Sequence, residues 1–225
     1  MFKIKSILII SSIAIALTGC IQFKPMALYS DESGIEVEAK NINGFTALNI
    51  FNDEITTEAW GMLNTKFQVF KPEKSITFKG NGSIHCWWDK ISDNSQYIGM
   101  GFGWDGWSGK NLEDIIDNAA IQFYIRNAKD SVKAVVIVGL IEDYAGTVAV
   151  CPNMTESKFY GGGRINETWK KVTVPLTDFT INKDIVDYSN VKQFIMQFEV
   201  KGDVYIDEIE IVPYTNPNAV PKPKS

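Results

Sequence analysis

Aromatic side chains near glycines, together with planar polar groups, are the residues of this sequence that could recognise a ligand. Trp104 and Trp107 flank Asp105-Gly106 after a glycine-rich stretch, and glycine leaves room for a ligand to approach a ring. An indole face can stack on the C–H groups of a sugar while amides, carboxylates and guanidinium groups hydrogen-bond its hydroxyls. Both tryptophans are therefore candidate ligand contacts. Alternatively, one closes the end of the fold and the other packs under a following short helix.

A second candidate set follows from strand alternation. Residues 121–126 and 193–200 alternate between apolar and polar side chains, as half-buried strands do. If Phe123 and Phe194 face the core, the polar side chains of both segments face outward. The outward set is Gln122, Tyr124, Arg126, Gln193, Gln197 and Glu199. These side chains either bind a ligand or form an ordinary solvated sheet face with an Arg-Glu pair.

Trp87 and Trp88 are adjacent, so in a strand they must point to opposite faces. Counting Cys86 as inward places Trp88 in the core and leaves Trp87 outside with His85, where it is a further candidate contact. His85 and Cys86 then face opposite ways, which argues against a catalytic Cys-His pair.

Composition excludes several functions. The chain has 27 acidic and 22 basic residues with one histidine, which argues against a nucleic-acid binder and a multi-histidine metal centre. The sequence carries no nucleophile elbow, phosphate loop or zinc signature. Carboxylates such as Glu142, Asp143, Glu199 and Asp105 leave a glycoside hydrolase as an alternative, but a lone domain of this size is more typical of a binding module.

The N-terminus predicts export. Residues 1–19 combine a basic start with an apolar run over 7–17, shorter than the roughly 20 residues of a transmembrane helix. The segment ending at Cys20 resembles the lipobox of bacterial lipoproteins, which implies lipid on Cys20 and anchoring in the bacterial cell envelope, at the outer membrane or cell surface. An ordinary secretory signal with an incidental cysteine is the alternative. The remaining thiols, Cys86 and Cys151, either form a disulfide or stay buried and free.

The elements expected to position these residues are β-strands. Strands are predicted at 66–70, 75–79, 83–88, 96–104, 121–126, 132–141, 171–176, 193–200 and 204–212. Helical spacing is confined to 112–119. The pattern predicts an all-β sandwich or jelly roll at 45–213, preceded by a tether at 20–44 and followed by a flexible tail at 214–225.

Four stretches in order resemble galactose-binding-like jelly rolls. They are 48–54 followed by Trp60, then 99–107, 121–126 and 204–211. The resemblance is to family 11 carbohydrate-binding modules and the related domain of the complex I assembly factor. It implies a ligand groove on the concave sheet face, lined by Tyr124, Arg126, Gln197 and Glu199.

The same resemblance implies a structural calcium ion between the loop after the first strand and the last strand. Asp53, Glu54 and Asp207 are the expected ligands, since calcium prefers oxygen donors. In the alternative, Asp53 caps a turn and Asp207 bonds to nearby backbone.

The predicted function is non-catalytic binding of a β-glucan-like polysaccharide by a membrane-anchored lipoprotein. The predicted contacts are Tyr124, Arg126, Gln197, Glu199, Trp104, Trp107, Gln122 and Trp87. A structural or assembly protein of the envelope, whose sheet face binds another protein, is the alternative. A groove with exposed tryptophan favours a glycan, and a flat apolar patch favours a protein.

Overall fold

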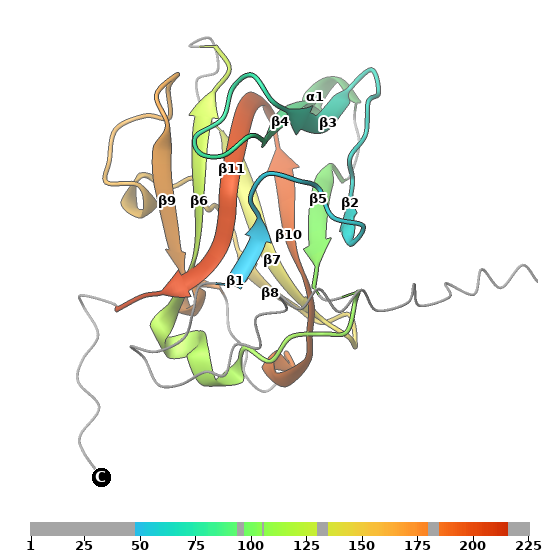
Figure 1. The fold of residues 1–225 in the computed structure, drawn as a ribbon, viewed down its shortest axis with the longest axis vertical. Helices are drawn as coiled ribbons and strands as arrows, with labels where there is room; N and C mark the ends of the chain where they lie inside the picture. The colour runs from blue at the N-terminus through green and yellow to red at the C-terminus, as the bar shows by residue number, and fades with distance from the viewer. Residues whose placement is uncertain (1–47, 94–96, 105, 130–134, 180–184, 216–225) are drawn as a thin grey trace, which may run out of the picture.

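The protein is a sandwich of two antiparallel β-sheets (Figure 1). A computed structural model describes residues 48–93, 97–104, 106–129, 135–179 and 185–215. The predicted signal peptide, Cys20, the tether and the tail beyond residue 215 lie outside the described residues. Within the described ranges, no helix has the length and apolar character needed to cross a membrane.

One sheet has six strands in the order β3-β4-β11-β6-β9, with β1 pairing with β11. The long strand β11 crosses the front of the molecule beside β6 (Figure 1). The strands are β1 Leu48–Phe51, β3 Gln68–Glu73, β4 Ser83–Asp89, β6 Ala119–Asn127, β9 Lys170–Pro175 and β11 Lys201–Pro213.

The other sheet has five strands in the order β2-β5-β10-β7-β8. They are β2 Ala59–Trp60, β5 Gly99–Gly103, β7 Val136–Asp143, β8 Val148–Cys151 and β10 Val191–Glu199. Short helical turns connect the strands: α1 Lys90–Asp93 and the 3-10 helices η1 Glu113–Asn118, η2 Ser157–Phe159, η3 Leu176–Asp178 and η4 Tyr188–Asn190. The helix predicted at 112–119 is η1, which buries Ile115 and Ile116.

Aromatic residues from both sheets build the core between them. Phe198 of β10 packs against Phe70 of β3 and Trp88 of β4, with ring centroids 4.6 and 4.8 Å apart. The residues that alternation assigns to the core, Phe51, Phe123, Phe194, Phe198 and Trp88, are all buried, which confirms the prediction. Period-two patterning was a sufficient signal because each of these strands has one face on the core.

The strand prediction differs from the structure in several places. Residues 75–79 form a loop, because two carboxylates bind several of the backbone N–H groups between 78 and 82. Strands β2 and β8 were missed because two and four residues are too few to show a period.

Cys86 and Cys151 are buried free thiols, so the disulfide alternative is wrong. Cys86 lies on β4 of the six-stranded sheet, and Cys151 lies on the edge strand β8 of the other sheet. Burial raises the pKa of Cys151 to about 11 and that of Cys86 well above its ordinary value, so both thiols stay protonated and unreactive at neutral pH.

Candidate functional site

The predicted ligand residues lie on two different sheets. Tyr124, Arg126 and Gln122 are on β6 of the six-stranded sheet, whereas Gln197 and Glu199 are on β10 of the five-stranded sheet. Outer faces of a two-layer sandwich point in opposite directions. The prediction that Tyr124, Arg126, Gln197 and Glu199 line one groove is therefore wrong. Alternation tells which side chains leave the core, but it does not tell which sheet a strand joins.

On the outer face of the five-stranded sheet, the outward positions of β5 are all glycines. Met100 and Phe102 are buried in the core, so Gly99, Gly101 and Gly103 occupy the outward positions. Three successive outward positions therefore carry no side chain. Other groups can therefore lie directly against the backbone of β5 at these three positions.

Three aromatic rings cover these glycines, and we call Tyr97, Trp60 and Trp107 the aromatic platform. A β-carbon at Gly103 would lie 2.7–2.9 Å from three ring atoms of Trp107, and one at Gly99 would meet the Tyr97 ring at 2.5–2.9 Å. Trp60 covers Gly101 in the same way. Since a strand rises about 3.3 Å per residue, the platform extends roughly 13 Å along β5. Only glycine lets the rings lie this close to the sheet.

Trp60 is held at the centre of the platform by its neighbours. It pairs with Gly101 across the sheet and stacks with Tyr97, with centroids 6.2 Å apart and an interplanar angle of 26°. Its Nε1 donates a 2.6 Å hydrogen bond to Gln193 Oε1. Gln193 Nε2 donates in turn to Glu142 Oε2. The other oxygen of that carboxylate, Oε1, lies 3.4 Å from Lys192 Nζ. The indole N–H is thus occupied, which leaves the ring face for contact.

Trp107 reaches the platform through an unusual backbone conformation. Gly106 and Trp107 have φ values of 66° and 67°, and the Trp107 N–H donates to Trp104 O at 2.8 Å. A non-glycine residue with positive φ is strained, and such strain often marks a functional residue. The sequence prediction that Trp107 is available to a ligand agrees with this placement, since Trp107 is partly exposed.

Trp104 does not belong to the platform. Its side chain is only 5% exposed and lies in the core, so the prediction that it contacts a ligand is wrong. Within the described part of the chain its Nε1 has no hydrogen-bond partner. The alternative reading, in which one of the two tryptophans packs inside the fold, holds for Trp104.

Polar groups beside the platform form charge-balanced pairs. Lys90 Nζ contacts both Glu199 oxygens at 2.6 and 2.7 Å, and Gln197 Nε2 donates to Glu199 Oε1 at 2.6 Å. Burial favours a higher pKa for Glu199, but the hydrogen bonds from Lys90 and Gln197 outweigh it and hold the pKa below its ordinary value. Burial, with a smaller contribution from the Glu142 charge, raises the pKa of Tyr97 to about 12. The face therefore presents a neutral phenol and paired charges.

The opposite outer face holds the other predicted contacts. Tyr124 stacks under Phe78, with centroids 3.6 Å apart, so one face of its ring is covered. Trp87 faces outward with His85, and Trp88 is buried, as alternation predicts. His85 bonds Asp203 at 2.8 Å and stacks on Tyr205, while Cys86 faces the core, so no Cys-His pair forms.

The carboxylates expected to bind calcium hold a loop instead. Asp53 Oδ1 accepts from the N–H groups of Asn81 and Gly82, and Asp207 Oδ2 accepts from those of Phe78 and Lys79. Among the described residues, no group of three or more His, Cys, Asp or Glu side chains is arranged to hold a metal ion. Asp53 and Asp207 thus bind the backbone of this loop, and the calcium site on Asp53, Glu54 and Asp207 stays a sequence prediction.

We expect calcium to leave the stability of the domain unchanged. Because the Asp53 and Asp207 oxygens already accept N–H groups, an added cation would gain few free ligands. Thermal unfolding of chelator-treated protein, with and without millimolar calcium chloride, measures this directly. A melting temperature that rises with calcium concentration would contradict this expectation and support the site predicted from the sequence.

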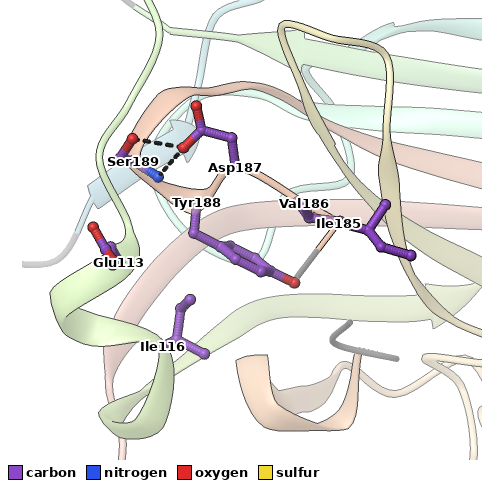
Figure 2. A pocket seen from close by; sticks show the side chains of 7 residues that line it. All are labelled: Glu113, Ile116, Ile185, Val186, Asp187, Tyr188 and Ser189. Atoms are coloured by element: carbon purple, nitrogen blue, oxygen red, sulfur yellow. Dashed lines mark hydrogen bonds between the residues drawn. The ribbon is translucent and has the colours of Figure 1, made fainter. Parts of the chain in front are cut away.

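A small pocket at another part of the fold lies between η1 and the segment around η4 (Figure 2). Its volume is about 390 Å³, and it is lined by Glu113, Ile116, Ile185, Val186, Asp187, Tyr188 and Ser189. None of the platform rings lines it. The platform is the better candidate site because it combines ring faces with amide and carboxylate groups on one continuous face.

Sequence reasoning missed Trp60 and Tyr97 as site residues. The available signal was the period-two spacing of Gly99, Gly101 and Gly103, which predicts a sheet face without side chains. The partner rings come from β2 and from the segment before β5, so their place on that face depends on strand pairing.

Comparisons with known proteins agree on one family. A family model described as carbohydrate binding domain 30 matches residues 47–213. No match to this chain was found among curated proteins.

Solved structures give the same fold. A family 30 carbohydrate-binding module superposes with a TM-score of 0.61 at 18% identity, covering 82% of this chain and 96% of its own. A family 30 module of a cellulosomal cellulase of Clostridium thermocellum gives a TM-score of 0.57 at 18% identity, covering 76% and 100%. A family 11 module from Clostridium thermocellum, solved with a β-1,3-1,4-mixed-linked tetrasaccharide, gives 0.50 at 11% identity, covering 75% and 96%. At these identities the likeness establishes the fold.

Proposed function

Because this chain belongs to the carbohydrate binding domain 30 family, we propose that the aromatic platform is the surface on which it binds a polysaccharide. The domain is a non-catalytic carbohydrate-binding module with a jelly-roll sandwich fold. The family is family 30, and the resemblance to family 11 is a likeness of fold. The observation that carries the platform proposal is the row of three rings over Gly99, Gly101 and Gly103.

The platform suits a sugar chain for a physical reason. A pyranose ring has an apolar face of C–H groups, which gains dispersion and hydrophobic energy against an aromatic ring. The hydroxyls of the sugar need donors and acceptors at the rim, and the Gln197 side chain lies there, across from Gly99. Because the three rings follow one strand, the surface fits an extended chain better than a single sugar.

We further propose that the polysaccharide is neutral and β-glucan-like. The charges beside the platform are already paired, Glu199 with Lys90 and Glu142 with Lys192, so a charged polymer would gain little from them. The family 11 module was solved in complex with a β-1,3-1,4-mixed-linked tetrasaccharide, and this supports a β-linked polysaccharide as the ligand class.

Affinity electrophoresis on native gels tests the function. The panel contains soluble β-1,3-1,4-glucan, hydroxyethyl cellulose, xylan and polygalacturonate, each cast into a separate gel. We expect retardation by at least one of the two glucans, no retardation by polygalacturonate, and no release of reducing sugar on incubation. A protein that migrates equally in every gel would overturn glycan binding and favour the alternative of an envelope-protein partner.

Membrane anchoring is a separate proposal, supported by the lipobox-like segment that ends at Cys20. A lipid there would hold the module at the cell envelope, so that bound polysaccharide stays near the cell. Mass spectrometry of the protein from bacterial membranes is expected to show an acylated Cys20 at the mature N-terminus. A soluble protein with an unmodified N-terminus would contradict the anchor without affecting the platform.

A further inference from the structure

A second exposed aromatic cluster lies on the outer face of the six-stranded sheet. Phe78 stacks on Tyr124 with a centroid distance of 3.6 Å and an interplanar angle of 13°. Trp169 meets Phe78 edge-on at 6.1 Å. Phe78 is 41% exposed although it is large and apolar. Since Tyr124 covers one face of the Phe78 ring, the exposed area is on the other side.

The loop that carries Phe78 is fixed rather than loosely attached. The N–H groups of Phe78 and Lys79 bind the buried Asp207 carboxylate, and those of Asn81 and Gly82 bind Asp53. Gly80 has a φ of 63°, and any side chain there would collide with the Asp53 carboxylate. The Phe78 ring therefore loses its conformational freedom when the protein folds and not when a ligand binds. A ligand that contacts the ring consequently binds with a smaller entropic cost.

The surroundings of the cluster suit a sugar better than a protein. Tyr124 pairs with Lys171 across the sheet, and Gln122 pairs with Thr173. Lys79, which follows Phe78, is exposed and forms an ion pair with Glu208 at 2.8 Å. The centres of protein interfaces are depleted in lysine and rich in apolar contact area. A ring face surrounded by amide, hydroxyl, ammonium and carboxylate groups, among them Gln122 and Glu210, instead offers one stacking surface with hydrogen-bonding groups for hydroxyls.

We propose that the cluster of Phe78, Tyr124 and Trp169 is a second glycan-contact surface, so that one domain holds polysaccharide on both outer faces. The inference rests on the proposed function for the ligand class but on different residues for the site. The two surfaces point in opposite directions, so a single glycan chain cannot lie flat on both. The domain therefore bridges two chains, or two stretches of one long chain, and gains avidity from both contacts.

Soluble β-1,3-1,4-glucan is the probe, and the readouts are gel retardation and light scattering from cross-linked polymer. Wild-type protein is expected to be retarded and to raise light scattering as protein is added. Phe78→Leu keeps an apolar cover on Tyr124 but removes the ring, so it is expected to lose the scattering while retardation stays within about twofold. Trp60→Ala is expected to keep a weak retardation. In the double variant Trp60→Ala/Phe78→Leu, the affinity for glucan is expected to fall about fivefold further.

Ile185→Ala is the matched control, because Ile185 is 58% exposed and lies on neither aromatic surface. Trp169→Ala gives a second route if the Phe78 variant unfolds, and unfolding is checked by the melting temperature. If Phe78→Leu and Trp169→Ala leave the light scattering unchanged, and also leave unchanged the weak retardation that remains after Trp60→Ala, the second surface is overturned and the platform is unaffected. If Phe78→Leu loses all binding while Trp60→Ala binds as tightly as wild type, the platform is overturned instead. A wild-type protein that is not retarded overturns both surfaces. If the Phe78 variant binds glucan normally but loses contact with another protein, the surface is a protein interface and the proposal fails.

Discussion

Replacing Trp60 by alanine is expected to weaken polysaccharide binding by about 30-fold or more, as for central aromatic contacts in other interfaces. Trp60 is the middle ring of the platform and stacks with Tyr97, so its loss divides the surface into two separate rings. The substitution also leaves Gln193 Oε1 without its indole donor. Isothermal titration with a soluble β-glucan oligosaccharide, supported by affinity electrophoresis, measures the change.

Trp87→Ala is the matched control for this experiment. Trp87 is a partly exposed tryptophan on the opposite sheet, and it is part of neither aromatic surface. We expect its replacement to change affinity by less than about twofold, within the range of ordinary surface substitutions. If Trp87→Ala weakens binding as much as Trp60→Ala does, the loss caused by Trp60→Ala is not specific to the platform and the platform assignment is wrong.

The second large effect is expected from Gln193, which positions Trp60 without contacting the ligand. Gln193 is 5% exposed, and both polar atoms of its side-chain amide are engaged: Oε1 accepts from Trp60 and Nε2 donates to Glu142. Its replacement by alanine leaves the Trp60 N–H without its acceptor and removes a side-chain bond that holds β2, an edge strand of two residues. We expect about tenfold weaker binding, which corresponds to ~1.4 kcal/mol, a typical cost of losing such a bond.

A double-mutant cycle separates this positioning role from a general loss of stability. Trp60→Phe keeps an aromatic ring but has no N–H to offer Gln193. If Gln193 acts through that bond, then Gln193→Ala costs much less in the Trp60→Phe background than in the wild type. Glu142→Gln retains an acceptor for Gln193 Nε2 and should bind within about twofold of wild type. Fully additive effects of Trp60→Phe and Gln193→Ala would contradict the positioning role.

Local pattern predicted the inside and outside of single strands well. In β6, the apolar residues Ile121, Phe123 and Ile125 are buried and the polar residues between them are partly exposed. Trp88 inside and Trp87 outside followed from the same rule. Such predictions hold because side-chain direction in a strand is set by the backbone of that strand alone.

The candidate site could not be predicted in the same way. Tyr124 and Glu199 both face outward, but they belong to strands of different sheets, β6 and β10. Trp60 reaches Gly101 only because β2 pairs with β5, and β2 has no periodic pattern of its own. Asp207 holds the loop around Phe78 through a hydrogen bond that spans a sequence separation of 129 residues, and no local pattern predicts it.

The sequence by itself determined an all-β sandwich with an aromatic core, because alternation and turn residues are local properties of the chain. The spacing of Gly99, Gly101 and Gly103 also indicated a strand face without side chains. Only the tertiary structure decided which rings cover that face, that Trp104 is buried while Trp107 turns back over Gly103, and that the two predicted halves of one groove lie on opposite sides. The physical reason is that strand order and register depend on hydrogen bonds between residues far apart in the chain, and no short-range pattern records them.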